Sequence, residues 1–299
     1  MNIGYIGVGN MGGALAKRLL LSHPLKVFDL SKESLGALVS AGAESVDSVA
    51  KLAESCDLIF ICLPTSREVR VVMLGEEGIA ANARRGTIVV DQTSGDPIIT
   101  REIAEKVKQL GIEFIDAPVS GGVAGAAAGT IAIMVGASAD QFAKVKPVVE
   151  AISPNIFHTG DVGTGHVAKL ANNMLSACCR LASLEAMALA TKNGMDPKTI
   201  VDVLLASSGS SQWLRLFGHA TVEGRLNVNF TLGLSHKDVR GACQLGADSG
   251  VPMHFGNTVK DIYQMAINEM GKETQVNAVA LFIDRLSGTQ FVPAKNDAS

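Results

Sequence analysis

The sequence lacks three features that would each place it in a different class of protein. It has no excess of basic residues, because 26 Lys and Arg stand against 29 Asp and Glu and leave a formal net charge of −3. A chain without a basic field is not expected to bind nucleic acid or an anionic membrane. It also lacks Cys-x-x-Cys pairs. Its five cysteines are odd in number, which predicts reduced thiols of a cytosolic protein rather than a disulfide framework.

Long uncharged apolar runs are missing as well, and none reaches the roughly 18 residues that a membrane span requires. The first residues carry neither a basic segment nor a cleavage site and enter a predicted strand at once. The six histidines are not spaced with carboxylates as metal ligands would be. We therefore expect an unprocessed cytoplasmic protein that has no metal site and binds neither a membrane nor nucleic acid.

Glycine, by contrast, is abundant, with 31 of 299 residues against a usual share of about 7 %. In the first half of the chain, short β-rich runs alternate with segments of helical spacing. This alternation predicts βαβ units on a doubly wound parallel sheet, of Rossmann type, with helices on both faces. The predicted strands are 2–7, 25–30, 57–64, 86–93, 112–120 and 130–136.

Beyond residue 162 the strand pattern stops and the remaining segments have helical spacing. We expect a dinucleotide-binding domain at 1–162 and an all-α domain for substrate binding and oligomerisation at 163–299. A helix over 164–192 would join them and would be about 40 Å long. The last residues, PAKNDAS, are predicted to form a loose tail. The other predicted helices are 197–206, 211–221, 235–250, 255–269 and 273–287.

The stretch GVGNMG has the G-x-G-x-x-G spacing of a dinucleotide-binding turn, with glycines at Gly7, Gly9 and Gly12. It follows a predicted strand and opens a predicted helix, which is the context that this pattern requires. Gly7 would permit the tight turn, Gly9 would let backbone N–H groups reach a pyrophosphate, and Gly12 would let helix and strand approach. Asn10 and Met11, between the last two glycines, belong to the same predicted cofactor site.

Asp29 ends the next strand, 20 residues after Gly9, and predicts the choice of cofactor. A carboxylate here accepts hydrogen bonds from the ribose hydroxyls and repels a 2′-phosphate. No arginine follows Asp29, although Lys32 is a candidate partner for a phosphate. The sequence therefore favours NAD and leaves NADP open.

Polar loops follow two further strands, at Leu63, Pro64 and Thr65 and at 91–94, which include Thr93. Because ligands bind at the carboxyl ends of parallel strands, these loops could line the cofactor or be ordinary strand–helix turns. Ser120, Gly121 and Gly122 leave backbone N–H groups accessible beside a hydroxyl. That combination suits either a cradle for a carboxylate or a flexible hairpin.

Four ordered motifs carry a resemblance that extends over essentially the whole chain. They are GVGNMG, DAPVSGG-x-x-GA-x-x-GT, G-x-x-G-x-G-x-x-x-K-x-x-NN at 160–173, and the dipeptide Lys237–Asp238. The chain thereby resembles the β-hydroxyacid dehydrogenases, the family of 3-hydroxyisobutyrate dehydrogenase and tartronate semialdehyde reductase. The resemblance implies a Rossmann-type domain, a long connecting helix, an all-helical domain, and a homodimer or homotetramer.

The resemblance also implies roles for individual residues. Lys169 matches the catalytic lysine, and Ser120, Gly121, Gly122 and Asn173 match the site for the substrate carboxylate. Lys237 matches a lysine near the nicotinamide, while Thr93, Leu63 and Pro64 match positions in the wall of the cofactor site.

Lys169 would act as general acid and base. In oxidation, the nicotinamide accepts a hydride from the carbinol carbon of a 3-hydroxy acid, and an amine must take the hydroxyl proton. A lysine can do this, and the reverse, when burial and a second cation lower its pKa toward neutrality. Lys237 is the candidate second cation. Asn173 lies one turn beyond Lys169 on the same helical face, whereas Asn172 is either a ligand or a structural contact.

Three other residues have two readings each. His166 is expected to cap or support rather than to catalyse. Trp213 is expected to pack in the core or an interface, although its segment could line the substrate. Arg215 could hold a second carboxylate, and Ser210 stands where some relatives of the family carry Arg, so the substrate stays open.

The leading hypothesis is an NAD(P)-dependent dehydrogenase of a small 3-hydroxy acid. The alternatives are a dehydrogenase of a larger or dicarboxylic acid such as 2-hydroxymethylglutarate, and a non-catalytic dinucleotide-binding module. Lys169 argues against the last alternative and against an imine reductase, whose members replace this lysine. The chain is too short for 6-phosphogluconate dehydrogenase and lacks matches to its phosphate-binding arginines.

Overall fold

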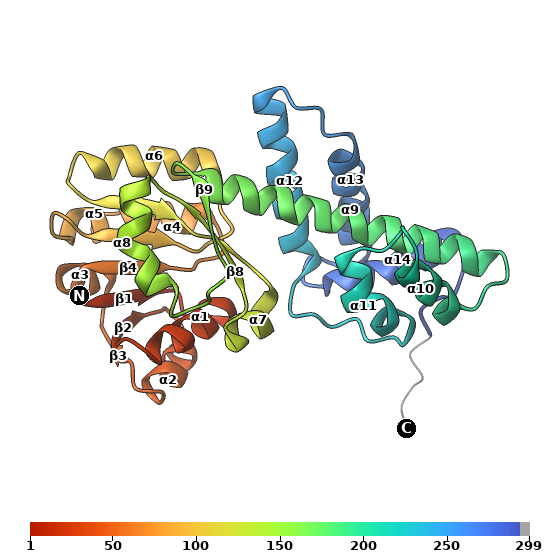
Figure 1. Cartoon of the computed structure of the whole chain (residues 1–299), viewed down its shortest axis with the longest axis horizontal. Helices are drawn as coiled ribbons and strands as arrows, with labels where there is room; N and C mark the ends of the chain where they lie inside the picture. The colour runs from red at the N-terminus through yellow and green to blue at the C-terminus, as the bar shows by residue number, and fades with distance from the viewer. Residues whose placement is uncertain (294–299) are drawn as a thin grey trace. The chain divides into compact units, whose positions relative to one another are not determined.

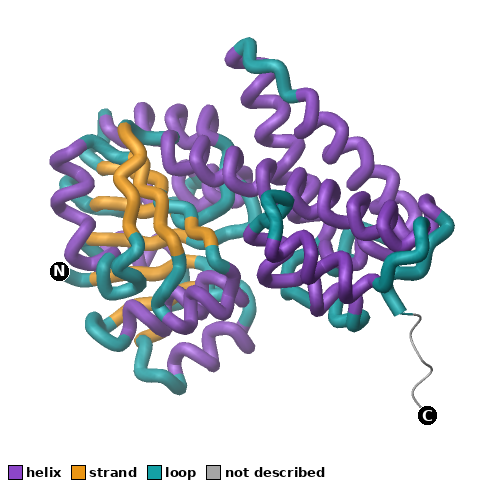
Figure 2. Tube along the Cα trace, turned by 45° about the vertical axis from the view of Figure 1, so that its right-hand side comes forward, coloured by secondary structure: helices purple, strands orange, loops and turns teal. Residues whose placement is uncertain are grey.

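The computed structural model describes residues 1–293 and forms two compact units, Met1–Lys169 and Leu170–Ser299. The predicted tail lies, from residue 294 on, outside the described residues. Strands belong to the first unit, and the described part of the second unit is built of helices (Figure 2). The predicted fold class, a Rossmann-type domain followed by an all-α domain, is confirmed.

The first unit contains a nine-stranded sheet with the order β3-β2-β1-β4-β5-β6-β8-β7, and β9 pairs with β8 (Figure 1). The neighbours from β3 to β6 are all parallel. The strands are β1 Ile3–Ile6, β2 Leu25–Phe28, β3 Glu44–Ser45, β4 Leu58–Ile61, β5 Ile88–Asp91, β6 Glu113–Asp116, β7 Val119–Ser120, β8 Ala132–Gly136 and β9 Ile156–Gly160.

Both faces of this sheet are buried under helices, as the continuous apolar strands predict. Along β4, Leu58 and Phe60 join one apolar cluster while Ile59 and Ile61 join another on the opposite face. The covering helices are α1 Asn10–Leu20, α2 Lys32–Val39, α3 Val49–Ser55, α4 Ser66–Leu74, α5 Ile79–Asn82, α6 Pro97–Lys108, α7 Gly122–Ala128 and α8 Ala139–Val149.

The sheet differs from the prediction at one end. There β8 runs antiparallel to β6 and β7, so the sheet is mixed rather than wholly parallel. The predicted strand 112–120 is divided into β6 and β7, and residues 122–128 form α7 instead of part of a hairpin. The edge strands β3 and β9 were not predicted; both are short, β3 is exposed and β9 is only partly buried.

The helix α9 Thr164–Lys192 begins in the first unit and continues into the second. The helical unit adds α10 Pro197–Ala206, α11 Gln212–Val222, α12 Leu232–Ser249, α13 His254–Met270, the 3₁₀ helix η1 Val276–Ala278 and α14 Val279–Ser287. Their apolar faces enclose a core to which α9 contributes Leu181, Leu184 and Met187.

By length and composition alone, α9 could also cross a membrane, and 39 % of its most apolar window is buried. Core helices of globular proteins pass the same test. The side chains that α9 contributes to the helical core give it that role here.

Candidate active site

The turn after β1 has one glycine that the fold does not explain. A Cβ at Gly7, where φ is +86°, would lie 2.3 Å from the Cys62 carbonyl oxygen, and one at Gly12 would lie 1.9 Å from the Gly7 oxygen. These two glycines are required by close backbone packing. A Cβ at Gly9 would meet nothing within 4 Å, and φ there is an ordinary −63°. The space beside Gly9 is therefore available to a group from outside the chain.

The helix that follows suits an anionic group in that space. Gly9 is the N-cap of α1 and provides no side-chain hydrogen bond to its first turn, which also lacks acidic residues. The first N–H groups of a helix point outward and carry partial positive charge. The turn thus fits the pyrophosphate of a dinucleotide.

Asp29 follows β2 and is held next to this turn. Its Oδ2 accepts a hydrogen bond from the Val8 backbone N–H at 2.6 Å, and its Oδ1 accepts one from Ser31 at 2.7 Å. Each carboxylate oxygen retains a lone pair for a further donor. The fixed carboxylate fits two ribose hydroxyls and would repel a phosphate.

The loops after β4 and β5 are joined through Thr93. The Thr93 hydroxyl accepts a hydrogen bond from the Leu63 N–H at 3.1 Å, and the Thr93 N–H donates to Asp91 Oδ1 at 3.0 Å. Leu63 and Thr93 therefore lie together at the carboxyl ends of adjacent strands, with Pro64 next in the chain. The loops after β4 and β5 are therefore joined to each other and are not independent strand–helix turns.

Asp91, at the end of β5, is a further functional candidate, which its sequence context alone did not single out. It is 1 % exposed, and its Oδ2 has no hydrogen-bond partner among the described residues. Burial raises the pKa of this carboxyl above its ordinary value of 3.8. Burial, followed by the nearby Asp91 charge, raises the pKa of the Cys62 thiol to about 12. Cys62 is consequently a poor nucleophile.

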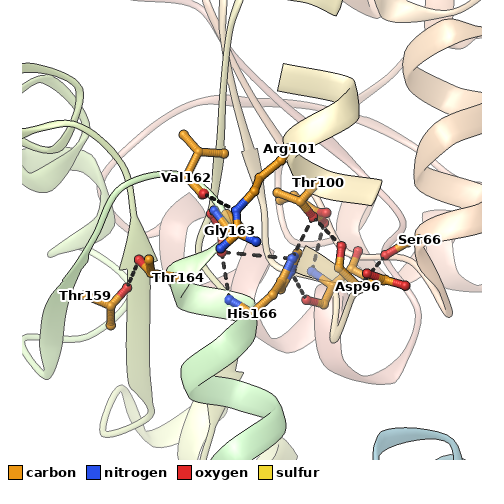
Figure 3. Close-up of polar contacts among 12 residues, drawn as sticks. Ser66, Asp96, Thr100, Arg101, Thr159, Val162, Gly163, Thr164 and His166 are labelled. Atoms are coloured by element: carbon orange, nitrogen blue, oxygen red, sulfur yellow. Dashed lines mark hydrogen bonds and ion pairs between the residues drawn. The ribbon is translucent and has the colours of Figure 1, made fainter. Parts of the chain in front are cut away.

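The buried imidazole of His166 connects the loop after β5 and helix α6 to the start of α9 (Figure 3). His166 is fully buried, and its Nε2 lies 2.9 Å from the Thr93 carbonyl oxygen, to which it donates. Its Nδ1 lies 2.8 Å from the Thr100 hydroxyl on α6. The prediction that His166 supports rather than catalyses agrees with these contacts.

Asp116, at the end of β6, holds the backbone of the same turn. Its two carboxylate oxygens accept hydrogen bonds from the Gly163 and His166 N–H groups at 2.6 and 2.7 Å. The register of the sheet sets Asp116 directly beside Asp91 on the neighbouring strand. The Asp116 carboxylate and the His166 imidazole thus fix the first turn of α9.

Lys169 follows His166 by three residues in this anchored part of α9. Its side chain is largely buried, with the residue only 8 % exposed. Lysine is seldom buried to this degree unless it is paired or used in chemistry.

Three of the four residues predicted to hold a carboxylate form a tight backbone turn in the first unit. Ser120 ends β7, and the two glycines after it adopt φ values of +143° and +70°, which L side chains rarely do. Gly121 and Gly122 are exposed. Their backbone conformation and exposure suit a loop that receives a small ligand.

In the helical unit, Asn173, Asp238 and Lys237 lie together. The Asn173 carboxamide donates to Asp238 Oδ2 at 2.6 Å, and the Lys237 ammonium lies 3.4 Å from Asp238 Oδ1. Asp238, which is 2 % exposed, was noted in the sequence only as part of a motif. Asn172 is exposed and donates to Asn173 Oδ1 at 3.1 Å.

The remaining candidates differ in exposure. Trp213 is 3 % exposed and its indole donates to Asn277 at 3.1 Å, so it packs in the core as the first of its two readings predicts. Arg215, on the same helix, is exposed. Across residues 1–293, no group of three or more His, Cys, Asp or Glu side chains could hold a metal ion.

Fold and site together define a two-domain oxidoreductase that uses a nicotinamide dinucleotide. Residues 2–160 match the model of the NAD-binding domain of 6-phosphogluconate dehydrogenase. Residues 163–283 match that of the NAD-binding domain of NADP-dependent 3-hydroxyisobutyrate dehydrogenase.

Individual proteins agree with these models. The chain is 36 % identical to 2-(hydroxymethyl)glutarate dehydrogenase of Eubacterium barkeri over 88 % of each chain. It is 40 % identical to 3-hydroxyisobutyrate dehydrogenase of Pseudomonas aeruginosa over 72 % of this chain and 73 % of that protein. The structure of Mycobacterium tuberculosis 3-hydroxyisobutyrate dehydrogenase with L-serine matches with a TM-score of 0.86 and 28 % identity, over 94 % of this chain and 98 % of that one. The chain belongs to the β-hydroxyacid dehydrogenase family and is an NAD(P)-dependent dehydrogenase of hydroxy acids.

Proposed function

We propose that this protein interconverts a small 3-hydroxy acid and its semialdehyde, with Lys169 as the general acid and base. The observation that carries the proposal is the burial of Lys169 in the turn of α9 that His166 and Asp116 anchor. In this assignment residues 1–162 bind the dinucleotide, and residues 163–299 supply substrate and subunit contacts.

The proposed oxidation removes one hydride and one proton from the substrate. The nicotinamide, when bound, supplies the hydride acceptor for the carbinol carbon. The neutral Lys169 amine takes the proton of the substrate hydroxyl as the C–H bond breaks, so that a carbonyl forms. In reduction the Lys169 ammonium returns this proton to the carbonyl oxygen.

The substrate carboxylate is assigned to Ser120, Gly121, Gly122 and Asn173. A hydroxyl, two accessible backbone N–H groups and a carboxamide are suitable donors for a carboxylate. In this proposal Asp238 is a positioning residue, because its hydrogen bond fixes the orientation of the Asn173 amide. Lys237, paired with Asp238, is assigned to the nicotinamide end of the cofactor.

NAD is the proposed physiological cofactor, because the fixed Asp29 carboxylate disfavours a 2′-phosphate. Values of kcat/KM with both cofactors test this preference. A clear advantage for NADP would reverse the assignment.

A dicarboxylic substrate is the second candidate. The similarity to 2-(hydroxymethyl)glutarate dehydrogenase favours it. Arg215 is a weak partner for a second carboxylate, because an exposed arginine gains little from such a pair.

A substrate panel tests the proposal and separates the two candidates. It comprises 3-hydroxyisobutyrate, glycerate, 3-hydroxypropionate, 4-hydroxybutyrate, serine, threonate and 2-hydroxymethylglutarate, followed by absorbance of the reduced nicotinamide. We expect the highest kcat/KM with a short monocarboxylic 3-hydroxy acid. The highest value with 2-hydroxymethylglutarate would favour the second candidate, and no turnover with any acid would contradict both.

We also propose that the protein is a cytoplasmic homodimer or homotetramer. Large apolar side chains of the helical unit are exposed in the single chain, among them Leu175, Leu189 and Phe255. Burial of such side chains between subunits would remove apolar surface from water. Light scattering coupled to size-exclusion chromatography distinguishes these assemblies from a monomer.

A further inference from the structure

The core of the helical unit contains a polar cluster that the proposed reaction does not use. Arg180 of α9, Trp213 of α11, Tyr263 of α13 and Asn277 of η1 form it, and we refer to them as the Arg180 cluster. Arg180 donates from Nε to Asn277 Oδ1 at 3.2 Å and from Nη1 to the Tyr263 hydroxyl at 2.6 Å. The Trp213 indole donates to the same Asn277 oxygen at 3.1 Å. Four separate elements of the helical unit therefore meet at this cluster.

No carboxylate among residues 1–293 forms an ion pair with the positive charge of the cluster. Arg180 is 6 % exposed, and Tyr263 and Asn277 are fully buried. Within residues 1–293, Arg180 forms no ion pair, whereas exposed arginines such as Arg225 and Arg285 each pair with a glutamate. A guanidinium withdrawn from water normally has an anionic partner, because desolvation of a lone charge is costly.

The cluster also has more donors than acceptors. The Asn277 oxygen accepts from both Arg180 and Trp213, which fixes the orientation of the amide. The Asn277 NH₂ group is buried without a hydrogen-bond partner among the described residues. The planar guanidinium has five N–H groups, and only its Nε and Nη1 donate to described partners. The chain thus provides a largely buried cation with surplus N–H donors, and its described acceptors are the Asn277 oxygen and the Tyr263 hydroxyl.

We propose that the Arg180 cluster binds a small monovalent anion, either a carboxylate group or a halide ion. Such an anion supplies both missing components, the negative charge and the acceptor lone pairs. A water molecule would supply acceptors without the charge, and a metal cation would be repelled. The planar edge of a guanidinium favours carboxylates in particular, because it can donate two parallel hydrogen bonds.

The anion can come from two sources. It can be a free ion, or it can be the second carboxylate of a dicarboxylic hydroxy acid, in which case the inference rests on the proposed function. Asn173 precedes Arg180 by seven residues on α9, which is about two turns and about 10 Å along the same face of the helix. Arginine side chains in helices lean toward the N-terminus, here in the direction of Asn173.

Thermal unfolding of the full chain tests the site without reference to activity. Sodium chloride and sodium formate are titrated separately against the wild type, Arg180→Met, Asn277→Asp and Arg225→Met. Arg225→Met removes an equal charge from the surface of the helical unit, so it controls for general salt effects.

We expect a saturable rise in Tm of about 2–4 °C in the wild type and in Arg225→Met, as a ligand of the native state produces. Arg180→Met should lose this rise because it lacks the cation. Asn277→Asp should lose it as well, since it places a carboxylate against Arg180, and its Tm without added anion should exceed that of the wild type. If Arg180→Met does not fold, the Tm response of Asn277→Asp to added anion tests the site by itself.

A wild-type Tm that does not respond to either salt would overturn the proposal. The same conclusion follows if Asn277→Asp keeps the wild-type response, because the anion would then bind elsewhere.

Kinetics then distinguish the two sources. If the site receives a substrate carboxylate, chloride should raise KM for 2-hydroxymethylglutarate at least about threefold and leave KM for 3-hydroxyisobutyrate unchanged. If the ligand is a free ion, neither KM should respond in the chloride range that raises Tm. Should no acid in the panel turn over, the proposed function fails while the thermal measurement still decides on the anion site.

Discussion

The protonation of buried Asp91 makes the stability of the folded chain depend on pH. Because burial raises the pKa of this carboxyl above 3.8, the folded chain retains a proton at pH values where the unfolded chain has released it. The contribution of Asp91 to stability is therefore complete at low pH and declines as pH rises from about 4 through the folded-state pKa.

We predict that Asp91→Asn reduces the decline of Tm between about pH 4 and pH 8, because the amide removes the buried charge. The amide oxygen can still accept the Thr93 N–H, so the loop should remain in place. Differential scanning calorimetry across this range measures the effect. The exposed Asp248→Asn is the control for loss of one negative charge. Equal pH profiles for Asp91→Asn and the wild type would contradict the account.

At the residue scale, the spacing of residues in the sequence predicts the close backbone contacts well. It predicts the contacts of buried polar side chains less well. The positions of Gly7, Gly9 and Gly12 follow from a pattern that is local in sequence. The roles of Asp91 and Asp116 do not, because they depend on β5 and β6 being neighbours in register. Likewise, the contact of Asp238 with Asn173 joins residues on different helices. A buried acid at the end of an apolar strand was the one available signal for Asp91 and Asp116.

At the scale of elements, the turn between β1 and α1 separates glycines that serve the fold from one that serves the cofactor. Gly9→Ala should leave the Tm of the cofactor-free protein nearly unchanged, since its Cβ meets no atom of the chain. It should weaken NAD binding about tenfold or more, because the methyl group occupies the space of the pyrophosphate. Calorimetric titration with NAD measures the change.

Two further variants delimit this prediction. Gly36→Ala, in α2, also meets nothing within 4 Å; it should leave NAD affinity unchanged and raise Tm slightly, because alanine has a higher helix propensity than glycine. Gly12→Ala should destabilise the fold itself, because its Cβ would clash with the Gly7 oxygen. Unaltered NAD affinity in Gly9→Ala would refute the assignment of this turn to the cofactor.

His166 ties α9 to α6 and to the loop after β5. Its replacement by alanine leaves the buried Thr93 carbonyl and Thr100 hydroxyl without this partner. We predict a loss of about 1–3 kcal/mol in the free energy of unfolding, and a fall in kcat from displacement of Lys169. Urea denaturation and steady-state kinetics measure the two effects, with the exposed His254→Ala as control. An unaltered kcat would show that the anchor does not position Lys169.

Elements with strong periodicity were predicted well from the sequence, and those that depend on tertiary contacts were not. The predicted helix 164–192 coincides with α9, and the predicted helix 197–206 coincides with α10. Edge strand β9 was missed because IFHTG is short and lacks a continuous apolar pattern. Helix α7, GVAGAAA, contains two glycines and packs against α1, so packing outweighs its weak intrinsic propensity.

At the scale of the whole molecule, the two units carry different parts of the proposed reaction. The first contains the dinucleotide turn, Asp29, the Thr93 loop and Lys169, and the second contains Asn173 and Lys237. The family and the use of NAD(P) were predictable because four motifs persist in order along the chain. The substrate was not, because the side chains that would select it lie in helices without a local motif.

The central claim is that Lys169 transfers the substrate proton. Its most direct test compares Lys169→Ala with the wild type in turnover of the best acid of the panel and in NAD affinity. We predict that kcat falls by about a thousandfold or more, as expected for loss of a general acid–base group, while the Kd for NAD stays within about twofold. A decrease in kcat of less than about tenfold, with NAD affinity retained, would contradict the assignment.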